Sequence, residues 1–302
     1  LACENAPDAA LSRARNAQRQ GDTPIHRQEV GRLRAGDIVV DATASEAVAA
    51  DHAPWLAQGI HVVTANKLGN GTALARAQQI GTAAAAGEAR YGDAATVGAG
   101  LPLLRSIRAL VAGGDHVHAI EGVLSGSLAW LFDRYDGSQP FSACVREAAA
   151  AGYTEPDPRI DLSGEDVRRK LLILARAAGV PLEADQISVD SLVPAALAAL
   201  DAADVDAALS LLDAPLAERL QQAQSQGLKL CFVGRLDGQG ASVGLRALPQ
   251  GHALAGGSGT DNRVAIHSDR YNTQPLLIQG PGAGAEVTAA ALLDDVLNIV
   301  NR

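Results

Sequence analysis

The chain has 302 residues, 47% of them hydrophobic and 20% charged, and it carries a formal net charge of −9. This length accommodates two domains with separate cores, and the acidic balance argues against nucleic acid or an anionic membrane surface as a partner, because both attract clustered lysine and arginine. The longest apolar run, nine residues over 192–200, is too short to span a bilayer and contains Pro194.

The first part of the chain alternates between short β-branched runs and helical stretches. Strands are predicted at 37–43 and 60–67, and helices at 45–59 and 72–86. Ser45 is a suitable N-cap for the first of these helices, and Pro54 is expected to kink or shorten it. Strands that alternate with helices at this spacing form βαβ units, so we expect a parallel sheet covered on both faces.

The pattern changes after Pro102. Helices are predicted at 103–112, 128–134, 141–151 and 164–178 and within 200–226, and a β-prone stretch is predicted at 116–127. Between 227 and 279, strand-like runs beside turn signals predict an antiparallel sheet. The glycine-rich segment 280–284 then opens a final helix that ends at Arg302.

Two residue types that often hold metals give little signal. The three cysteines, Cys3, Cys144 and Cys231, are scattered and form no C-x-x-C pair. We therefore expect neither a structural zinc site nor a disulfide framework, and a reducing cytoplasm is the simplest compartment. His116 and His118 share one face of a predicted strand, but without a further ligand this pair predicts no metal site.

The segment 152–170 carries the strongest chemical signal. Its nineteen residues hold a group of carboxylates and one lysine, at Glu155, Asp157, Asp161, Glu165, Asp166 and Lys170. Asp166 and Lys170 are four apart on a predicted helix and can touch, for which a surface ion pair is the plain alternative. Long proline-containing acidic loops are usually functional. Only three of the 25 basic residues are lysine, and a desolvated lysine, unlike arginine, can exchange a proton near neutral pH.

Polar residues also follow the first two predicted strands. The sequence T-A-S at Thr43–Ser45 follows the first, and Asn66 and Lys67 end the second. Open parallel sheets bind ligands at the carboxyl ends of their strands, although polar residues also simply end strands. Two glycine-bearing connections add weaker signals. The segment 280–284 would let a cofactor approach the backbone or would simply form a tight turn, and 96–102 offers carbonyls to a ligand or a monovalent cation.

Several motifs occur in the order seen in one enzyme family. They are D-A-T-A-S at Asp41, H-V-V-T-A-N-K at His61, T-V-G-A-G-L-P-L-L at Thr96, G-V-L-S-G-S at Gly122, the block A-G-Y-T-E-P-D-P-R-I-D-L-S-G-E-D-V-R-R-K-L-L-I-L-A-R, and G-P-G-A-G-A-E-V-T-A-A. The chain resembles homoserine dehydrogenases, most of all the dehydrogenase half of bifunctional aspartokinase–homoserine dehydrogenases. The resemblance covers 36–302 well and 1–35 poorly.

The resemblance implies a fold, an activity and partners. The expected fold is α/β: a Rossmann-like domain over 1–101, completed by 281–302, and an α+β catalytic and dimerisation domain over 102–280 with a largely antiparallel sheet. The implied reaction interconverts L-homoserine and L-aspartate 4-semialdehyde with NAD or NADP, in the biosynthesis of threonine, methionine and isoleucine. A homodimer or higher homo-oligomer and a fused aspartokinase are the implied partners.

The resemblance also implies a role for each matching residue. The catalytic residues would be Lys170, Asp166 and Lys67. Glu155, Asp161, Gly152 and Lys67 would bind the substrate, with carboxylates on its ammonium group. Thr43, Ala44, Lys67, Gly282 and Gly284 would bind the cofactor, which itself performs the hydride transfer. The carbonyls of Val97, Ala99 and Leu101 would hold Na⁺ or K⁺.

Two departures from the family pattern stand in the sequence. No G-x-G-x-x-G occurs upstream of Asp37 and the chain has no methionine, so we expect the first βα unit to be missing. The acidic residue that the family places three before the V of T-V-G-A-G is Ala94 here, with Asp93 one position away. The alternative to an active enzyme is therefore a truncated remnant that folds and dimerises but binds no dinucleotide. An oxidoreductase acting on another amino-acid semialdehyde is a third reading.

Overall fold

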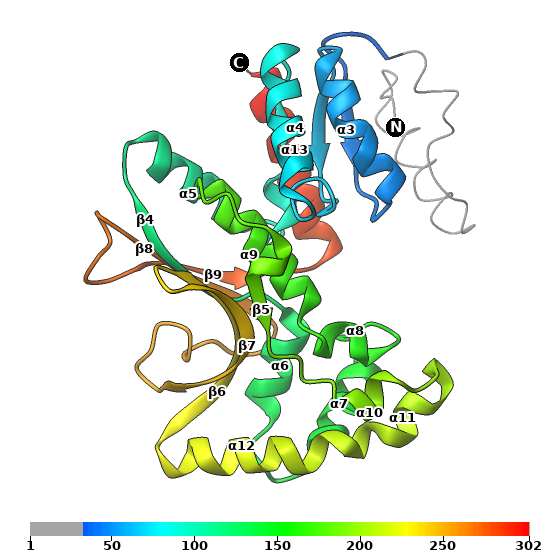
Figure 1. The fold of residues 1–302 in the computed structure, drawn as a ribbon, viewed down its shortest axis with the longest axis vertical. Coiled ribbons are helices and arrows are strands. Elements are labelled where there is room, and N and C mark those ends of the chain that lie inside the picture. Colours follow the sequence, from blue (N-terminus) through cyan, green and yellow to red (C-terminus); the bar gives the residue numbers. More distant parts are fainter. Residues whose placement is uncertain (1–32, 302) are drawn as a thin grey trace.

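The computed structural model describes residues 33–301. The expected loss of the first βα unit and the missing glycine-rich turn concern residues 1–32 and therefore lie outside the described residues. The described chain forms a small parallel sheet with its helices and a larger, mostly antiparallel sheet with its own helices (Figure 1). The expected α/β fold class is confirmed.

The small sheet has three parallel strands in chain order, β1 (Ile38–Asp41), β2 (His61–Thr64) and β3 (Tyr91–Gly92). Helices α3 (Glu46–Ala57) and α4 (Leu74–Ala86) connect them. Ser45 caps α3 as predicted, because its side chain accepts a hydrogen bond from the Val48 N–H. Pro54 lies inside α3, and the helix continues past it to Ala57.

The last helix, α13 (Ala285–Val300), returns to this small sheet and packs against β2, β3 and the short 3-10 turn η1 (Ala94–Thr96). Val62 faces the core beneath α3 and α4, whereas Val63 joins the core beneath α13. Neighbouring residues of a strand point to opposite faces, so both faces of the sheet are covered.

The larger sheet has six strands in the order β5-β7-β6-β4-β8-β9. Its strands are β4 (Val117–Val123), β5 (Ile187–Val189), β6 (Leu228–Asp237), β7 (Gly240–Pro249), β8 (Asp261–Ser268) and β9 (Leu276–Pro281). All neighbours are antiparallel except β5 and β7. The predicted antiparallel character is confirmed. The short strand β5 was not predicted, and β4 lies between two strands that come more than 100 residues later.

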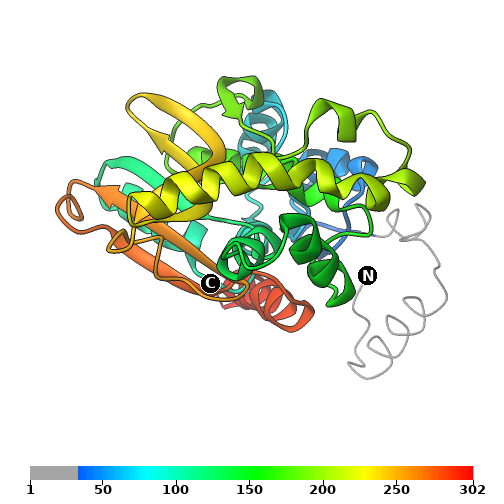
Figure 2. The same cartoon turned by 90° about the horizontal axis from the view of Figure 1, so that it is seen from below.

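The remaining helices pack on this sheet or on one another. They are α5 (Leu103–Ala112), α6 (Gly126–Arg134), α7 (Phe141–Ala150), α8 (Pro158–Leu162), α9 (Glu165–Ala177), α10 (Ala195–Ala198), α11 (Val205–Ala208) and α12 (Asp213–Ser225), with the 3-10 turns η2 (Ala184–Gln186), η3 (Ala202–Asp204) and η4 (Leu209–Leu212). Figure 2 shows the yellow-green α12 lying across the end of the domain. In the largest core, alternate residues of β6 such as Phe232 meet the apolar face of α9. Over 33–301, no helix is long and apolar enough to cross a membrane.

Candidate active site

The side chain of Lys170 enters the protein from the second turn of α9. This helix begins after Gly164, whose φ of 78° lies in the left-handed region that glycine tolerates. Lys170 is 8% exposed, and its Nζ lies 2.8 Å from Asp166 Oδ2. It also donates a 2.7 Å hydrogen bond to the carbonyl oxygen of Leu124. Two of its three N–H donors are therefore held by the protein, which leaves one for a ligand.

Asp166 lies between two lysines. Its Oδ2 meets Lys170, and its Oδ1 is 3.6 Å from Lys67 Nζ. Partial burial acts to raise the pKa of Asp166, but the positive charges of Lys170 and Lys67 outweigh it and the pKa is lowered. The carboxylate also sits in the first turn of α9, where the helix dipole favours negative charge. The Asp166 side chain is 41% exposed and that of Lys67 is partly exposed, so this carboxylate and Lys67 face an open surface, whereas Lys170 is buried.

The polar residues at the two strand ends lie beside each other, because Asp41 at the end of β1 pairs with Thr64 at the end of β2. The Asn66 side-chain amide donates a 2.9 Å hydrogen bond to the Ser45 carbonyl and so joins the two ends. Thr43 is held by Asp41, whose Oδ1 accepts from both its backbone N–H and its hydroxyl. Ala44 beside it is exposed. This edge therefore presents a small apolar side chain on a fixed backbone.

Asp41 is the centre of a buried polar network that the sequence did not indicate. Its Oδ2 lies 2.9 Å from His52 Nε2, and His52 Nδ1 lies 3.1 Å from the Tyr91 hydroxyl. Burial acts to raise the pKa of Asp41, but the hydrogen bonds from His52 and Thr43 outweigh it and the pKa is lowered. The network ties the end of β1 to α3 and β3 and makes the strand end rigid.

The loop after β2 is held against α9 and η2 by residues that the sequence did not single out. Arg176 Nη1 donates a 2.6 Å hydrogen bond to the Asn70 carbonyl. Glu183 Oε2 accepts a 2.9 Å hydrogen bond from the Leu74 N–H, at the first turn of α4, whose N-cap residue provides no side-chain cap. These contacts join the two halves of the molecule and bring Lys67 to Asp166.

The acidic loop is organised by Asp161. Its Oδ1 accepts a 2.6 Å hydrogen bond from the Ser127 hydroxyl, and its Oδ2 accepts a 2.8 Å hydrogen bond from the Glu155 N–H. Gly152 has a φ of 73° and ends the turn that leads into the loop. The Glu155 side chain is exposed and makes no hydrogen bond or ion pair with another residue of 33–301. Asp161 therefore fixes the backbone that carries a free carboxylate.

Asp157 has a different part in this loop. It caps α8 by accepting from the Arg159 N–H, and it pairs with the Arg159 guanidinium at 2.7 Å. The Arg159 side chain lowers the pKa of Asp157. Arg159 also donates to the carbonyls of Leu197 and Leu200, at 3.2 and 2.6 Å. Asp157 is thus engaged in anchoring the loop to the segment around α10.

Comparison with known proteins assigns the chain to a family. The sequence profile described as homoserine dehydrogenase matches residues 102–297, and the one described as homoserine dehydrogenase, NAD binding domain, matches residues 4–92. The chain belongs to the homoserine dehydrogenase family. The resemblance seen in the motifs is confirmed.

Two relatives carry the name of this family, and a solved structure shares the fold of the chain. A bifunctional aspartokinase/homoserine dehydrogenase 1 of Zea mays is 42% identical over 281 residues, which is 92% of this chain and 30% of the relative. The homoserine dehydrogenase of Emericella nidulans is 40% identical over 278 residues, 88% of this chain and 76% of the relative. A crystal structure of a Candida auris protein of unknown function superposes with a TM-score of 0.87 at 36% identity, covering 93% of this chain and 82% of the other. The chain thus spans about a third of the bifunctional relatives it matches.

The two glycines that the family pattern assigns to the cofactor lie before α13. Gly284 is the N-cap residue of α13 and has a φ of 130°. Gly282 is packed against Asn262: an added Cβ would lie 2.0 Å from Asn262 Cγ. The absence of a side chain at Gly282 therefore has an internal reason besides the approach of a cofactor.

The carbonyls expected to hold a monovalent cation lie in a buried turn after η1. The carbonyls of Val97 and Ala99 receive no hydrogen bond from residues 33–301, whereas that of Leu101 accepts from the Leu103 N–H at 2.8 Å. Asp93, the acidic residue next to the expected position, is buried in a two-pronged pair with Arg108, at 2.5 and 2.8 Å. Two unpaired buried carbonyls fit a cation, while Asp93 is already neutralised.

Sequence reasoning missed two residues that contact the site. Asn262 Nδ2 donates a 3.2 Å hydrogen bond to the same Leu124 carbonyl that binds Lys170, and Ser127 holds Asp161. One signal pointed to Asn262. In D-N-R-V-A-I-H-S, strand alternation places it on the same face as Val264 and Ile266, so a polar residue occupies a core position.

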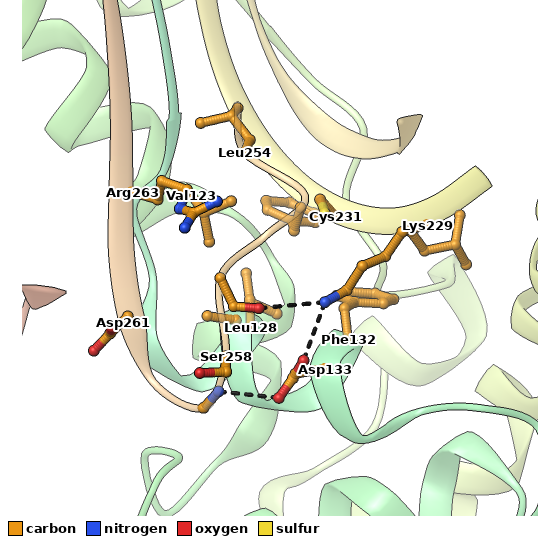
Figure 3. Close-up of a pocket in the computed structure, with 15 residues that line it drawn as sticks. Val123, Leu128, Phe132, Asp133, Lys229, Cys231, Leu254, Ser258, Asp261 and Arg263 are labelled. Atoms are coloured by element: carbon orange, nitrogen blue, oxygen red, sulfur yellow. Dashed lines mark hydrogen bonds and ion pairs between the residues drawn. The ribbon is translucent and has the colours of Figure 1, made fainter. Parts of the chain in front are cut away.

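A separate small cavity lies away from Lys170, between α6, β6 and the loop before β8 (Figure 3). Its volume is about 30 Å³, room for a water molecule and far too little for a dinucleotide. Lys229 at its edge bonds to Asp133 Oδ1 at 3.1 Å and to the Gly257 carbonyl at 3.3 Å. Lys229, for which the sequence predicted no role, therefore ties this loop to α6.

Proposed function

We propose that the chain catalyses the NAD(P)-dependent interconversion of L-homoserine and L-aspartate 4-semialdehyde. The observation that carries this proposal is the cluster in which Lys170, Asp166 and Lys67 meet beside the acidic loop. Family membership and the Emericella nidulans homoserine dehydrogenase, of which the chain covers 76%, support it.

Lys170 is the proposed acid/base group. Two of its donors are fixed on Asp166 and the Leu124 carbonyl, so the remaining position on Nζ points to a defined place. During homoserine oxidation the neutral amine accepts the hydroxyl proton, and during reduction the ammonium returns a proton to the carbonyl oxygen. Asp166 stabilises the ammonium form, and Lys67 adds a positive charge that favours a developing alkoxide.

The substrate's ammonium group is proposed to bind at the acidic loop. Glu155 offers a free carboxylate, and Asp161 holds the backbone of Glu155 in place while keeping lone pairs for a further donor. Gly152 provides the turn from α7 into this loop. A carboxylate on a backbone held in the same half of the molecule as the acid/base lysine would favour an amino acid over a simple alcohol.

The described residues fit a dinucleotide at the carboxyl edge of the parallel sheet. Thr43 and Ala44 form a fixed strand end with an exposed methyl group, suited to a flat ring. Lys67 follows β2 at this edge and reaches Asp166, and Gly284 opens α13, which packs on the same sheet. When bound, the cofactor supplies the hydride chemistry. Whether NAD or NADP is preferred depends on residues before 33.

We also propose a monovalent cation, Na⁺ or K⁺, on the carbonyls of Val97, Ala99 and Leu101. Unpartnered buried carbonyls at Val97 and Ala99 support it. Turnover should fall when Na⁺ and K⁺ are replaced by choline at constant ionic strength, and equal turnover in all three salts would remove the site.

A homodimer or higher homo-oligomer, a fused aspartokinase and a cytoplasmic location complete the proposal. The names of the bifunctional relatives support the fusion, and free buried thiols at Cys144 and Cys231 suit a reducing compartment. Light scattering of the purified chain measures its oligomeric state directly.

The proposed activity is tested by mixing purified chain and homoserine with NAD⁺ or NADP⁺ and following the absorbance of the NADH or NADPH formed. Turnover with homoserine and none with other amino alcohols is expected. Calorimetric titration with NADPH gives the second arm: absence of binding and of turnover would instead identify the non-catalytic remnant.

A further inference from the structure

We propose that Asn262 is a positioning residue for Lys170 and acts through the carbonyl oxygen of Leu124. The inference rests on the acid/base role proposed above for Lys170. Asn262 is 0% exposed and lies at the beginning of β8, on the strand face that carries the core residues Val264 and Ile266. Burying an amide among apolar residues costs desolvation free energy that an apolar side chain would avoid, so a hydrogen bond made by Asn262 must account for its presence.

The reason lies in a shared acceptor. The Leu124 carbonyl accepts from Lys170 Nζ at 2.7 Å and from Asn262 Nδ2 at 3.2 Å. Leu124 follows the end of β4 and precedes the N-cap of α6, so no strand partner fixes its carbonyl. A carbonyl oxygen has two lone pairs, and these two donors use both. Asn262 therefore holds the oxygen in the direction that the lysine requires.

The oxygen side of the amide supports this orientation of the Asn262 side chain. Asn262 Oδ1 is buried and receives no hydrogen bond from residues 33–301. The alternative orientation of the amide would aim Oδ1 at the Leu124 oxygen, and two acceptors would then face each other. Gly282 packs directly against the Asn262 amide and restricts its movement on that side. The unpartnered Oδ1 lowers the stability of the protein, and the amide is retained because its Nδ2 donates to Leu124.

The position of the Leu124 carbonyl determines where the third N–H of Lys170 points. Lys170 has three donors, of which one goes to Asp166 and one to Leu124. If the Leu124 carbonyl turned away, only Asp166 would hold the ammonium, and its free N–H would no longer point to one place. Misplacement of a reacting group by about 1 Å can cost roughly 100-fold in rate.

The test replaces Asn262 by Asp. The carboxylate cannot donate to Leu124, and it puts a negative charge about 6 Å at most from Lys170 Nζ, since both groups touch one oxygen. In N262D, kcat should fall roughly tenfold or more with little change in KM, and the pH dependence of kcat should move to higher pH. The matched control is N272D. Asn272 is exposed in the turn that follows β8, and the end of that strand at Ser268 already lies roughly 20 Å from Asn262, so its substitution should change neither.

A pH dependence in N262D that coincides with that of the unsubstituted enzyme would overturn the inference, even if the variant is less stable. Should N262D fail to fold, N262A removes the donor without adding a charge. A lower kcat at constant KM is then expected, and an unchanged kcat would equally refute the role.

A readout independent of turnover separates this inference from the proposed function. The chain has only three lysines, so ¹³Cε-lysine NMR gives three signals that single Lys→Arg variants assign. The titration curve of the Lys170 signal should move to higher pH in N262D and stay in place in N272D. If the enzyme proves inactive on homoserine, the proposed function fails while this shift still supports the contact. An unmoved Lys170 curve in N262D rejects the inference, whatever the substrate.

Discussion

Substitution of Lys170 tests the proposed chemistry most directly. The K170A variant loses the amine that contacts both Asp166 and the Leu124 carbonyl. General acid/base catalysis contributes about 10²- to 10⁴-fold, so kcat should fall by that factor, equivalent to about 2.7–5.5 kcal/mol in the activation barrier. Folding should change much less, because the loss of a nearly buried charged hydrogen bond, about 1.5–3 kcal/mol, is partly offset by no longer burying the charge.

Two further variants separate proton transfer from charge. K170R keeps the positive charge but cannot release a proton, so it should be as inactive as K170A. K229A removes a lysine that bonds to Asp133 and the Gly257 carbonyl, and its turnover should equal that of the unsubstituted chain. The measurement is steady-state turnover in both directions, with thermal unfolding as the control for folding. Substantial activity in K170R would refute the proton-transfer argument, and near-normal turnover in K170A would remove Lys170 from the reaction.

Three other predictions concern the surroundings of this lysine. E155Q should raise the KM for homoserine roughly tenfold and leave the KM for the cofactor nearly unchanged, since one charge-assisted contact is weakened; an equal rise in both would contradict ammonium binding. Asp41 and Asp166 have lowered pKa values, so the stability they contribute is complete above the ordinary value of 3.8 and is lost as the pH falls through the lower folded values. Acid unfolding followed by circular dichroism should therefore be less steep in D166N than in the unsubstituted chain, and coinciding curves would contradict the shift. G282A should destabilise the protein by about 1–3 kcal/mol through collision with Asn262, and the N262A/G282A pair should recover part of this loss; strict additivity in denaturant unfolding would show that the two residues do not touch.

The site combines parts of the chain that are far apart in sequence. Lys67 comes from the parallel-sheet half, whereas Asp166 and Lys170 lie in the first two turns of α9 in the other half. Arg176 and Glu183 hold the two halves together close to this point. The distance between Lys67 and Asp166 therefore depends on contacts outside the site, and changes in those contacts should be felt in turnover as well as in stability.

The sequence alone predicted most of the helices. It gave α5 its bounds of 103–112 and placed the N-cap of α3 at Ser45, because these features depend on residues within a turn or two. It also placed Asp166 and Lys170 on one helix face, since four residues make about one turn. The sequence did not predict the short helix α8 or the strand β5. The first is a single capped turn inside a loop, and the second has three residues that pair in parallel with a strand more than 50 residues later.

Local patterns thus determined the fold class, the helices and the candidate lysine, because hydrophobic period, capping and residue chemistry are written in consecutive residues. Tertiary structure alone decided which elements meet: β4 between β6 and β8, α13 on the parallel sheet, and Lys67 opposite Asp166. It also decided that Lys170 and Asn262 share the Leu124 carbonyl. Every residue carries a backbone carbonyl, so no side-chain pattern in the sequence indicates which carbonyl will accept these hydrogen bonds. The packing of α9, the segment at Leu124 and β8 selects it.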